Sequence, residues 1–389
     1  MLARNAWEKR KLREVSDVRD GTHASPKYYS QGYPLVTSKN LTSAGLDFSN
    51  ISLISELDYK NINKRSRVDK GDILFGMIGT IGTPVMVHES NFAIKNVALI
   101  KEREAVLNSF LVQLLKSPAF INYIRNENVG GTQKFLSLNT IRNFRFSFPT
   151  SKEQAMVSRF LEKIDSLIAA TQRRIDDLEQ VEKTLLQHLF DQSWRFNVYS
   201  DPWVKSKVAN MAKENFGGGT PSTKKRSFWT GSLPWIQSSD LDKSNKYTVI
   251  PKKFISSAAL KSSAAKKVPS NSIAVVTRVG VGKLAFINYD YATSQDFLSF
   301  SFLNWSAFFS VNLLTRVMEQ MSNEGQGTSI KGVTKSELLA KSVLIPTSLE
   351  EQISIGNLLK SFDDLIKSTS NRLSKLELLK TSLLKNLFV

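Results

Sequence analysis

Polar and basic residues follow strand-like segments in both halves of the chain, in sets that could bind a nucleic acid. The sets are Ser38, Lys39 and Asn40 with Thr132, Gln133 and Lys134 in the first half, and Gln237, Ser238 and Ser239 with Arg278, Lys283, Ser329 and Lys331 in the second. Lys and Arg suit phosphate oxygens, and hydroxyl and amide groups suit base edges. For each residue taken singly, a solvated loop position is an equally good interpretation.

Other chemistries find little support in the sequence. Gly76, Gly79 and Gly82 follow a strand-like run, but Pro84 and more strand come next instead of the helix that a phosphate or dinucleotide site needs. There is no Walker A motif and no Asn-Pro-Pro-Tyr motif, and the chain has no cysteine and only three scattered histidines. We therefore expect no catalytic residue, metal site or cofactor in this chain, and a stand-alone nuclease or methyltransferase is disfavoured.

A repeated long helix is the element around which these loops must be arranged. Residues 153–190 match residues 351–388 without a gap, at an offset of 198 positions. Both copies open with Glu-Gln and close with Leu-Phe, and no proline interrupts either. At about 1.5 Å per residue, each helix would be roughly 57 Å long.

The apolar residues of both copies recur three and four positions apart, which is typical of a coiled-coil seam. The predicted seam comprises Leu161, Ile164, Ile168, Ile175, Leu178, Leu185 and Leu189 in the first copy and Leu359, Phe362, Ile366, Leu373, Leu376, Leu383 and Leu387 in the second. Such a narrow seam needs a partner, and we expect the other copy, in an antiparallel pair. Phe160, Leu167, Val181 and Leu186 lie off the seam, where they would dock another protein or pack on the globular parts.

The rest of the chain divides into two related globular parts. Each begins with a tryptophan, Trp7 or Trp203, and continues through a Gly-Thr turn, several strand-like runs, a helical segment (around 108–125 or 305–321) and a glycine-rich loop. We predict an α+β (mixed α/β) fold with globular domains at 1–150 and 199–348 and spacer helices within 151–198 and 349–389. Related scaffolds with divergent loops would suit the recognition of two different targets.

The distribution of charge favours a polyanionic partner. The formal net charge is +18, whereas the two helix copies together carry eleven basic and eleven acidic residues. The whole excess therefore lies in the globular parts, which indicates nucleic acid as the simplest partner. The N-terminal residues lack the apolar segment of a signal peptide, and we find no long uncharged apolar run, so we expect a soluble cytoplasmic protein that does not enter a membrane.

The order of these features resembles that of the specificity subunits of Type I restriction–modification enzymes. The resemblance rests on the two tryptophan openings, the Gly-Thr-Pro-Ser segment at 219–222, the Gly-Thr loops at Gly131 and Gly327, and a proline shortly before each Glu-Gln, at Pro149 and Pro346. Each motif is short, but their order is repeated twice and covers essentially the whole chain.

The resemblance implies that each globular part is a target-recognition domain that reads one half of a bipartite, asymmetric site in double-stranded DNA. The residue sets above would then contact DNA, and removing a base-reading arginine such as Arg278 should cost about 1–3 kcal/mol. The paired helices would set the distance between half-sites. Two methyltransferase (modification) subunits would bind around the helices and motor/nuclease (restriction) subunits would join them; S-adenosylmethionine and ATP would serve those partners.

Two other interpretations remain at this point. The chain could be a non-enzymatic scaffold whose coiled coil pairs two protein-binding domains, which the neutral helices allow and the basic globular parts disfavour. It could also be an RNA-binding accessory protein, although no aromatic stacking motif is present. Steeply salt-dependent DNA binding would separate the first alternative from the Type I reading.

Overall fold

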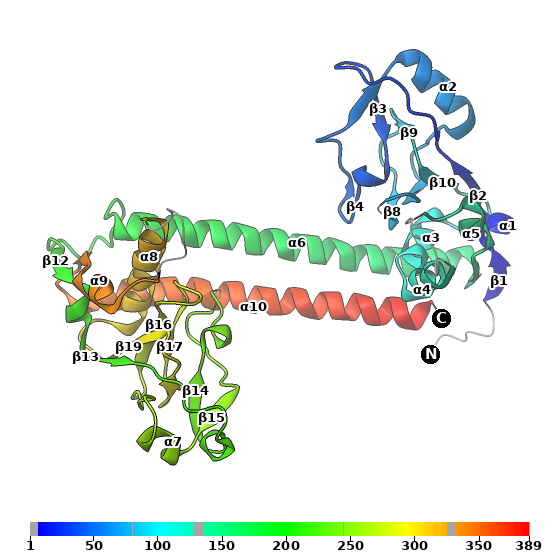
Figure 1. Cartoon of the computed structure of the whole chain (residues 1–389). Coiled ribbons are helices and arrows are strands. Elements are labelled where there is room, and N and C mark those ends of the chain that lie inside the picture. The colour runs from blue at the N-terminus through cyan, green and yellow to red at the C-terminus, as the bar shows by residue number, and fades with distance from the viewer. Residues whose placement is uncertain (1–6, 80, 128–134, 244, 325–331, 389) are drawn as a thin grey trace. The chain divides into compact units, whose positions relative to one another are not determined.

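The computed structural model describes residues 7–79, 81–127, 135–243, 245–324 and 332–388 (Figure 1). The chain forms two compact units, of which unit 1 comprises residues 1–172 and 372–389 and unit 2 comprises residues 173–371. The boundary between the units falls within both long helices, so each unit contains one section of each helix.

Unit 1 is built on a four-stranded antiparallel sheet in the order β2-β10-β7-β8. A three-stranded sheet, β6-β3-β9, contains one parallel pair, β3 with β9, and β1 pairs with β11 and β4 with β5. The strands are β1 (Glu8–Lys11), β2 (Asp17–Asp20), β3 (Tyr33–Val36), β4 (Leu41–Thr42), β5 (Gly45–Leu46), β6 (Ser52–Ile54), β7 (Ile73–Gly76), β8 (Gly82–Met86), β9 (Ala93–Ile94), β10 (Val97–Lys101) and β11 (Arg145–Phe148).

The helices of unit 1 include two that the sequence suggested as one. They are α1 (Leu12–Val15), α2 (Glu56–Ser66), α3 (Asn108–Leu115), α4 (Pro118–Glu127), α5 (Leu138–Asn143) and the first part of α6 (Ser151–Phe190). The predicted segment 108–125 divides into α3 and α4 because Pro118 has no backbone N–H to continue the first helix, whereas proline fits the first turn of the next one.

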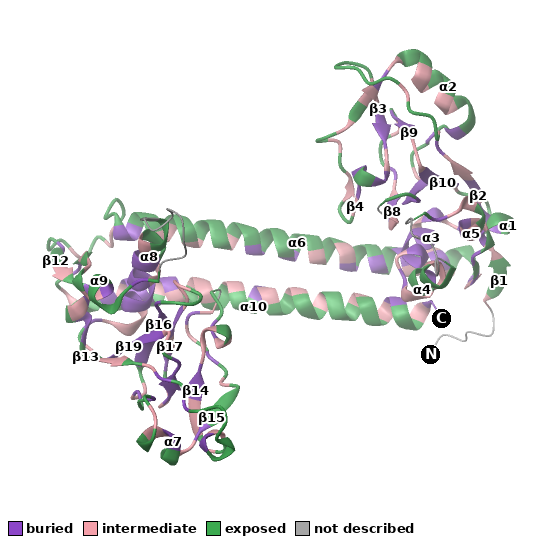
Figure 2. Cartoon of the chain, in the orientation of Figure 1, coloured by how far each residue is buried: buried purple, intermediate pink, exposed green. Residues whose placement is uncertain are grey.

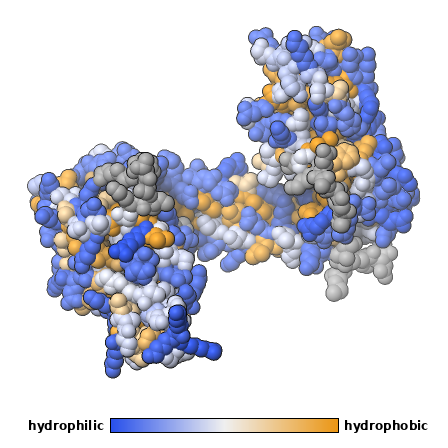
Figure 3. Space-filling view, viewed as in Figure 1, coloured by the Kyte–Doolittle hydropathy of each residue, from blue (hydrophilic) through white to orange (hydrophobic). Residues whose placement is uncertain are grey.

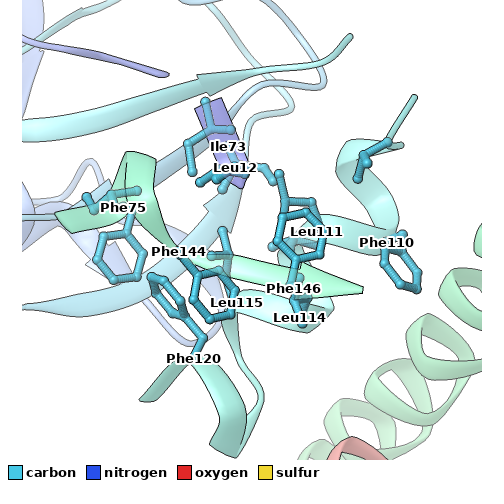
Figure 4. Packing of buried hydrophobic residues seen from close by; sticks show 14 of the residues in the cluster. Leu12, Ile73, Phe75, Phe110, Leu111, Leu114, Leu115, Phe120, Phe144 and Phe146 are labelled. Carbon is cyan, nitrogen blue, oxygen red and sulfur yellow. The ribbon is translucent and has the colours of Figure 1, made fainter. Parts of the chain in front are cut away.

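The main core of unit 1 lies where the sheet, α3 and α4 meet the long helices. Figure 4 shows Phe75 from β7 and Phe110 and Leu111 from α3 among the side chains of this core. Leu161 of α6 and Phe388, just after α10 (Leu349–Leu387), belong to the same buried cluster. The helix pair is therefore part of the core of unit 1, and burying such large apolar groups supplies about 1.5–3 kcal/mol each.

Unit 2 repeats the four-stranded sheet, the three-stranded sheet and the terminal strand pair of unit 1; the short β4–β5 pair belongs to unit 1 and has no counterpart among the strand pairs of the described residues of unit 2. Its sheets have the orders β13-β19-β16-β17, β15-β14-β18 and β12-β20, and the parallel pair is again in the three-stranded sheet, β14 with β18. The strands are β12 (Val204–Lys207), β13 (Ala212–Gly217), β14 (Leu233–Ile236), β15 (Lys253–Ile255), β16 (Ser272–Val276), β17 (Leu284–Ile287), β18 (Ala292–Thr293), β19 (Phe297–Leu303) and β20 (Ser342–Ile345). The helices are α7 (Ser257–Lys261), α8 (Ala307–Glu324), α9 (Lys335–Ala340) and sections of α6 and α10. The structure thus confirms the predicted repeated mixed α/β fold.

The two long helices pack against each other in each unit. In unit 1, Leu161 shares a cluster with Leu384 and Phe388; in unit 2, Leu189 shares one with Ile355 and Leu359. Asp165, four residues after Leu161, pairs with Lys380, four residues before Leu384, so the sections in unit 1 are antiparallel. In unit 2, Glu182 and Asp363 contact the same lysine, Lys246, whereas Leu189 shares a cluster with Ile355, so these sections are antiparallel as well.

All of the predicted seam residues are buried or half-buried, whereas much of the remaining helix surface is exposed (Figure 2). Off the seam, Phe160, Leu167 and Val181 are exposed and Leu186 packs on the core of unit 2. None of the described helices combines the length and hydropathy needed to cross a bilayer.

Candidate functional site

The predicted polar residues of unit 2 gather at the end of β14. Gln237 follows the strand, and a 3-10 turn over Ser238–Asp240 is closed by the Gln237 backbone N–H, which donates to the Asp240 carboxylate over 3.0 Å. Lys283, in the turn between β16 and β17, donates to the carbonyl oxygens of Ser238 (3.2 Å) and Leu241 (2.9 Å). The structure therefore brings Gln237–Ser239 together with the turn that carries Lys283. The Lys283 ammonium stabilises the loop after β14 through these two hydrogen bonds.

The turn that leads to Lys283 has the backbone conformation that its glycines allow. Gly280 and Gly282 have φ angles of +88° and +90°, which side-chain-bearing residues rarely adopt. A Cβ placed on Gly280 would lie 3.7 Å from the Cβ of Ser238, so the turn packs closely on the β14 loop. Arg278 is exposed beside it. Among the described residues predicted to bind in unit 2, Arg278 and Ser239 are exposed, whereas Gln237, Ser238 and Lys283 are half-buried.

Lys253 on β15 is a basic residue of this surface that the sequence did not indicate. Its ammonium lies 3.1 Å from Gln237 Oε1 and 5.6 Å from the centre of the Trp235 ring. Gln237 in turn donates from Nε2 to Ser239 Oγ over 2.8 Å. Lys253 is opposite Trp235 across the β14–β15 pair, a proximity that depends on strand register and so could not be read from the sequence.

The corresponding turn of unit 1 is closed by an equivalent hydrogen bond from the backbone to the side chain three residues later. After β3, the Asn40 amide oxygen accepts from the Thr37 backbone N–H (2.9 Å), and the Asn40 side chain donates to the carbonyl of Asp47 (3.0 Å). Ser38 is buried and donates to the carbonyl of Asn96 over 3.3 Å, whereas Lys39 is exposed. Asn40 and Ser38 thus build the turn, and Lys39 is the member of this predicted set that faces solvent.

Five of the predicted contact residues belong to the two glycine-rich loops. Thr132, Gln133, Lys134, Ser329 and Lys331 lie outside the described residues. The residue that follows one of these loops, Phe135, forms a bridge with Ile78 in the segment between β7 and β8, and Val333 donates its backbone N–H to the carbonyl of Thr277. The described end of each loop therefore contacts the segment that follows β7 in unit 1 or β16 in unit 2.

A second repeated site anchors the start of each long helix. In unit 1, Gln154 accepts the backbone N–H of Leu107 at Oε1 (2.9 Å) and donates to the carbonyls of Ala105 and Pro149. In unit 2, Gln352 accepts the backbone N–H of Ser306 (3.0 Å) and donates to the carbonyl of Pro346. The buried glutamine explains why both copies open with the same residue after a proline.

The glutamate before that glutamine binds the tryptophan that opens each unit. The Trp203 indole donates to Glu351 over 3.1 Å, and Trp7 donates to Glu153 over 3.4 Å. Glu351 also receives two hydrogen bonds of 2.7 Å from Arg195. These contacts tie the first strand of each unit to its long helix across some 150 residues of sequence.

A charged cluster in unit 2 joins the loop after β14 to both long helices. The Lys246 ammonium lies 3.0 Å from Glu182 on α6 and 3.3 Å from Asp363 on α10, and it donates to Asn312 on α8. Burial raises the pKa of Asp363 to about 6, against the opposing effect of Lys246, and burial also raises the pKa of Tyr247. The cluster thus fixes the loop on the helix pair at a cost in desolvation of the acids.

Within the described parts of the chain, no group of three or more His, Cys, Asp and Glu residues is arranged to hold a metal ion. The arrangement seen in both units is therefore one of exposed basic and polar side chains on a loop held by backbone contacts. Such side chains can donate to phosphate and base-edge acceptors and can be exchanged without disturbing the scaffold beneath.

A model of the family described as type I restriction modification DNA specificity domain matches the chain twice, at residues 5–180 and 200–378. A Methanocaldococcus jannaschii protein, named provisionally as the MjaX specificity subunit of a type I restriction enzyme, is 22% identical over 386 residues, which cover 93% of this chain and 88% of the relative. The crystal structure of the S subunit of a Type-I restriction–modification system from M. genitalium has a TM-score of 0.68 at 13% identity and covers 100% of this chain and 98% of its own. A chain from a study of complex assembly and conformational transition in the type I R-M system has a TM-score of 0.59 at 16% identity, with 97% and 96% covered.

Proposed function

This chain belongs to the type I restriction modification DNA specificity family, and we propose that its two units read the two halves of a bipartite, asymmetric site in double-stranded DNA. The observation that carries this proposal is the repeated strand-end turn on two equivalent sheets. The turn is built in the same way in both units, but its outward residue is Lys39 in one and Ser239 in the other. One scaffold with different exposed side chains is what two different half-sites require.

Arg278 and Lys253 are the basic groups of unit 2 that we assign to DNA. Arg278 extends from a turn packed on the β14 loop, and Lys253 lies beside Gln237. An arginine can donate two hydrogen bonds to guanine, and a lysine supplies a point charge for a phosphate. In unit 1 we assign Lys39, and the contacts predicted in the glycine-rich loops, which lie outside the described residues, remain predictions.

The long helices act in this proposal as the spacer between half-sites and as the docking surface for two methyltransferase subunits, which motor/nuclease subunits join. The proposal is supported by the continuity of α6 and α10 over 40 and 39 residues and by the exposed apolar Phe160, Leu167 and Val181. The chain itself is non-catalytic and works in the cytoplasm, and S-adenosylmethionine and ATP serve the partner subunits.

Methylation mapping of DNA from cells with and without the gene tests the function. We expect a bipartite, adenine-methylated motif that disappears when this chain is removed and its methyltransferase partner is kept. An R278A variant in the same experiment should relax one half-site and leave the other unchanged. An unaltered methylome beside an active methyltransferase would refute the proposal and favour the scaffold interpretation.

The same mapping can test the spacer if residues are inserted in both helices at once. Insertions of seven residues after Gln172 and after Asn371 fall at the unit boundary, so the pairing within each unit is kept. Seven helical residues add about 10 Å, which is close to three base pairs of B-DNA. We expect a gap longer by about three base pairs with both half-sites unchanged; a changed half-site with an unchanged gap would contradict the spacer role.

A further inference from the structure

An open apolar groove lies in unit 1 where the start of α6 meets the end of α10. The groove has a volume of about 790 Å³ and is lined mainly by Glu153, Met156, Val157, Phe160, Leu383 and Leu387. Met156 and Phe160 are 61% and 54% exposed. Among the many blue side chains of Figure 3, apolar ones are visible on the surface of the long helices. This helix-end groove is unusual because large side chains of this kind normally find a partner.

The internal repeat shows what covers the same positions in unit 2. The counterparts of the six lining residues, 198 positions away along the chain, are Glu351, Ser354, Ile355, Leu358, Leu185 and Leu189. The segment 191–202, which connects α6 to β12, lies on them: Tyr199 bonds to Ser354 over 3.0 Å, and Phe196 packs on the cluster that contains Ile355 and Leu189. Glu351 and Ile355 are each only 1% exposed as a result.

Glu153, which lines the groove, lacks the arginine contact that its counterpart Glu351 has. Glu351 is held by Trp203 and by a bidentate contact from Arg195. Glu153 keeps the tryptophan contact, at 3.4 Å, but none of the basic side chains in the described parts of the chain pairs with it. A half-buried carboxylate with room beside it is a binding position for a guanidinium group, which can donate two charged hydrogen bonds to it.

The residues around the groove also differ from those of unit 2. Lys152 and Arg159 take the places of Glu350 and Asn357, and Met156 takes that of Ser354. A ligand of this groove would therefore meet the apolar Met156 where the connecting segment meets the hydroxyl of Ser354. Apolar or aromatic side chains would bind more tightly at that position, and acidic residues would bind more tightly near Lys152 and Arg159.

We propose that the helix-end groove binds a segment of a partner protein that resembles the connecting segment 191–202. The segment carries an arginine for Glu153, an aromatic or large apolar side chain for Met156 and Phe160, and acidic residues for Lys152 and Arg159. The connecting segment of unit 2 is the chain's own version of this ligand; among the described residues, this segment covers the site in unit 2 and no equivalent segment covers the groove in unit 1.

A synthetic peptide with the sequence 191–202, which includes Asp191, Arg195, Phe196 and Asp201, is the probe for this site. The chain contains no cysteine, so M156C introduces a single thiol into the groove of the full-length chain, and S354C provides the matched thiol under the segment in unit 2. We expect the M156C thiol to react rapidly with a thiol reagent in the free chain and S354C to react slowly. Saturating peptide should slow the M156C reaction at least tenfold.

Two matched changes test the arginine contact. A peptide with alanine in place of Arg195, and the E153Q variant, which keeps an acceptor for Trp7, should each weaken peptide binding roughly tenfold, as the loss of one charged hydrogen bond predicts. Unchanged binding in either case would contradict the assigned role of Glu153. Neither measurement involves DNA or methylation, so its failure is separate from failure of the proposed function.

Three results would overturn the proposal. In the first, the free M156C thiol is already as protected as S354C, which means that the chain covers the groove itself. In the second, protection grows with the concentration of the chain alone, which identifies a second copy as the occupant. In the third, the peptide leaves the M156C reaction rate unchanged, which means that the groove does not bind a segment of this chemistry.

Discussion

Asp165 in unit 1 and Asp363 in unit 2 occupy the same position of the repeated helix, but their surroundings differ. Asp165 forms an ion pair with Lys380, directly across the helix pair. The counterpart of Lys380 in the repeat is Glu182, so in unit 2 two carboxylates approach each other. Lys246, from the loop after β14, lies within 3.3 Å of both. One charge reversal on a helix has thus been compensated by a residue of the globular part.

The difference has a consequence for how each unit is held on its helices. In unit 1 the helices neutralise each other at this level, with side chains that are 21% and 31% exposed. In unit 2 the neutralising group belongs to a loop that also carries Gln237–Asp240 toward the proposed DNA surface, and the Lys246 side chain is only 10% exposed. The loop of unit 2 is therefore tied to the spacer, whereas in unit 1 the matching ion pair involves the spacer alone.

The largest expected effect comes from removing Lys246. K246M leaves Glu182 and Asp363 buried without their cation, and we expect unit 2 to lose about 3–5 kcal/mol of unfolding free energy. K380M is the matched change in unit 1 and should cost less than about 1 kcal/mol, because its ion pair is more exposed. Hydrogen exchange followed peptide by peptide would measure both units in one experiment.

The double variant K246M/E182K converts unit 2 to the arrangement of unit 1. A lysine at position 182 would face Asp363 as Lys380 faces Asp165, so we expect at least half of the lost stability to return. Equal losses for K246M and K380M, or no recovery in the double variant, would show that the loop is not held in this way.

Replacing Gln154 or Gln352, near the start of each long helix, should lower the free energy of unfolding substantially and by similar amounts in both units. Q154A removes a side chain that makes three hydrogen bonds to the backbone, one of them to the buried Pro149, and Q352A removes one that makes two, one of them to the buried Pro346. Because buried backbone groups left without partners cost about 1–3 kcal/mol each, we expect losses of roughly 2–4 kcal/mol, slightly greater for Q154A. Urea unfolding with fluorescence and hydrogen exchange would measure them.

The exposed Gln180 on α6 provides the control, since the one side-chain hydrogen bond that it makes among the described residues is to Thr184, over 3.5 Å. Q180A should change stability by less than about 0.5 kcal/mol. If Q154A and Q352A are as mild as Q180A, the repeated Glu-Gln is not the structural anchor that its contacts indicate.

The sequence predicted the architecture well because the repeat and the helical periodicity are both local patterns. The ungapped match between the two helix copies predicted the long helices and the repeated fold. The alternation of residue types after a proline predicted the strands at Tyr33–Val36 and Leu233–Ile236. The break between α3 and α4 at Pro118 could have been read in the same way. Contacts made across long stretches of sequence could not.

Two equivalent contacts between a globular helix and α6 or α10 show why long-range contacts could not be predicted from the sequence. In unit 1, Ser109 on α3 meets Ser158 on α6. In unit 2 the corresponding contact joins Phe308 to Gly356, where a Cβ would lie 2.6 Å from the Phe309 backbone nitrogen. A small residue is needed opposite a large one, but neither sequence position reveals its partner. The same holds for Lys246 and its two acids, and for the roles of Ser38, Asn40 and Lys283 in holding loops rather than extending from them.

The last expected effect is a pH dependence of the unfolding free energy of unit 2 that arises from Asp363. Because burial raises the pKa of folded Asp363 from 3.8 to about 6, the folded unit binds more protons than the unfolded chain between these values. The contribution of Asp363 to the free energy of unfolding is therefore fully present below about pH 4 and is lost as the pH rises to about 6. Glu182, Lys246 and Tyr247 face this carboxylate, and D363N removes its titration while leaving the pair between Lys246 and Glu182.

Intrinsic fluorescence reports this effect selectively, because five of the six tryptophans lie in unit 2 and Trp7 alone lies in unit 1. We expect D363N to flatten the decline of unfolding free energy between pH 4 and 6, by at most about 1.4 kcal/mol per pH unit. D165N removes the carboxylate at the same position of the repeat in unit 1 and serves as the reference curve. If D363N and D165N give curves of the same slope, burial of the acid pair in unit 2 does not distinguish the two ends of the spacer.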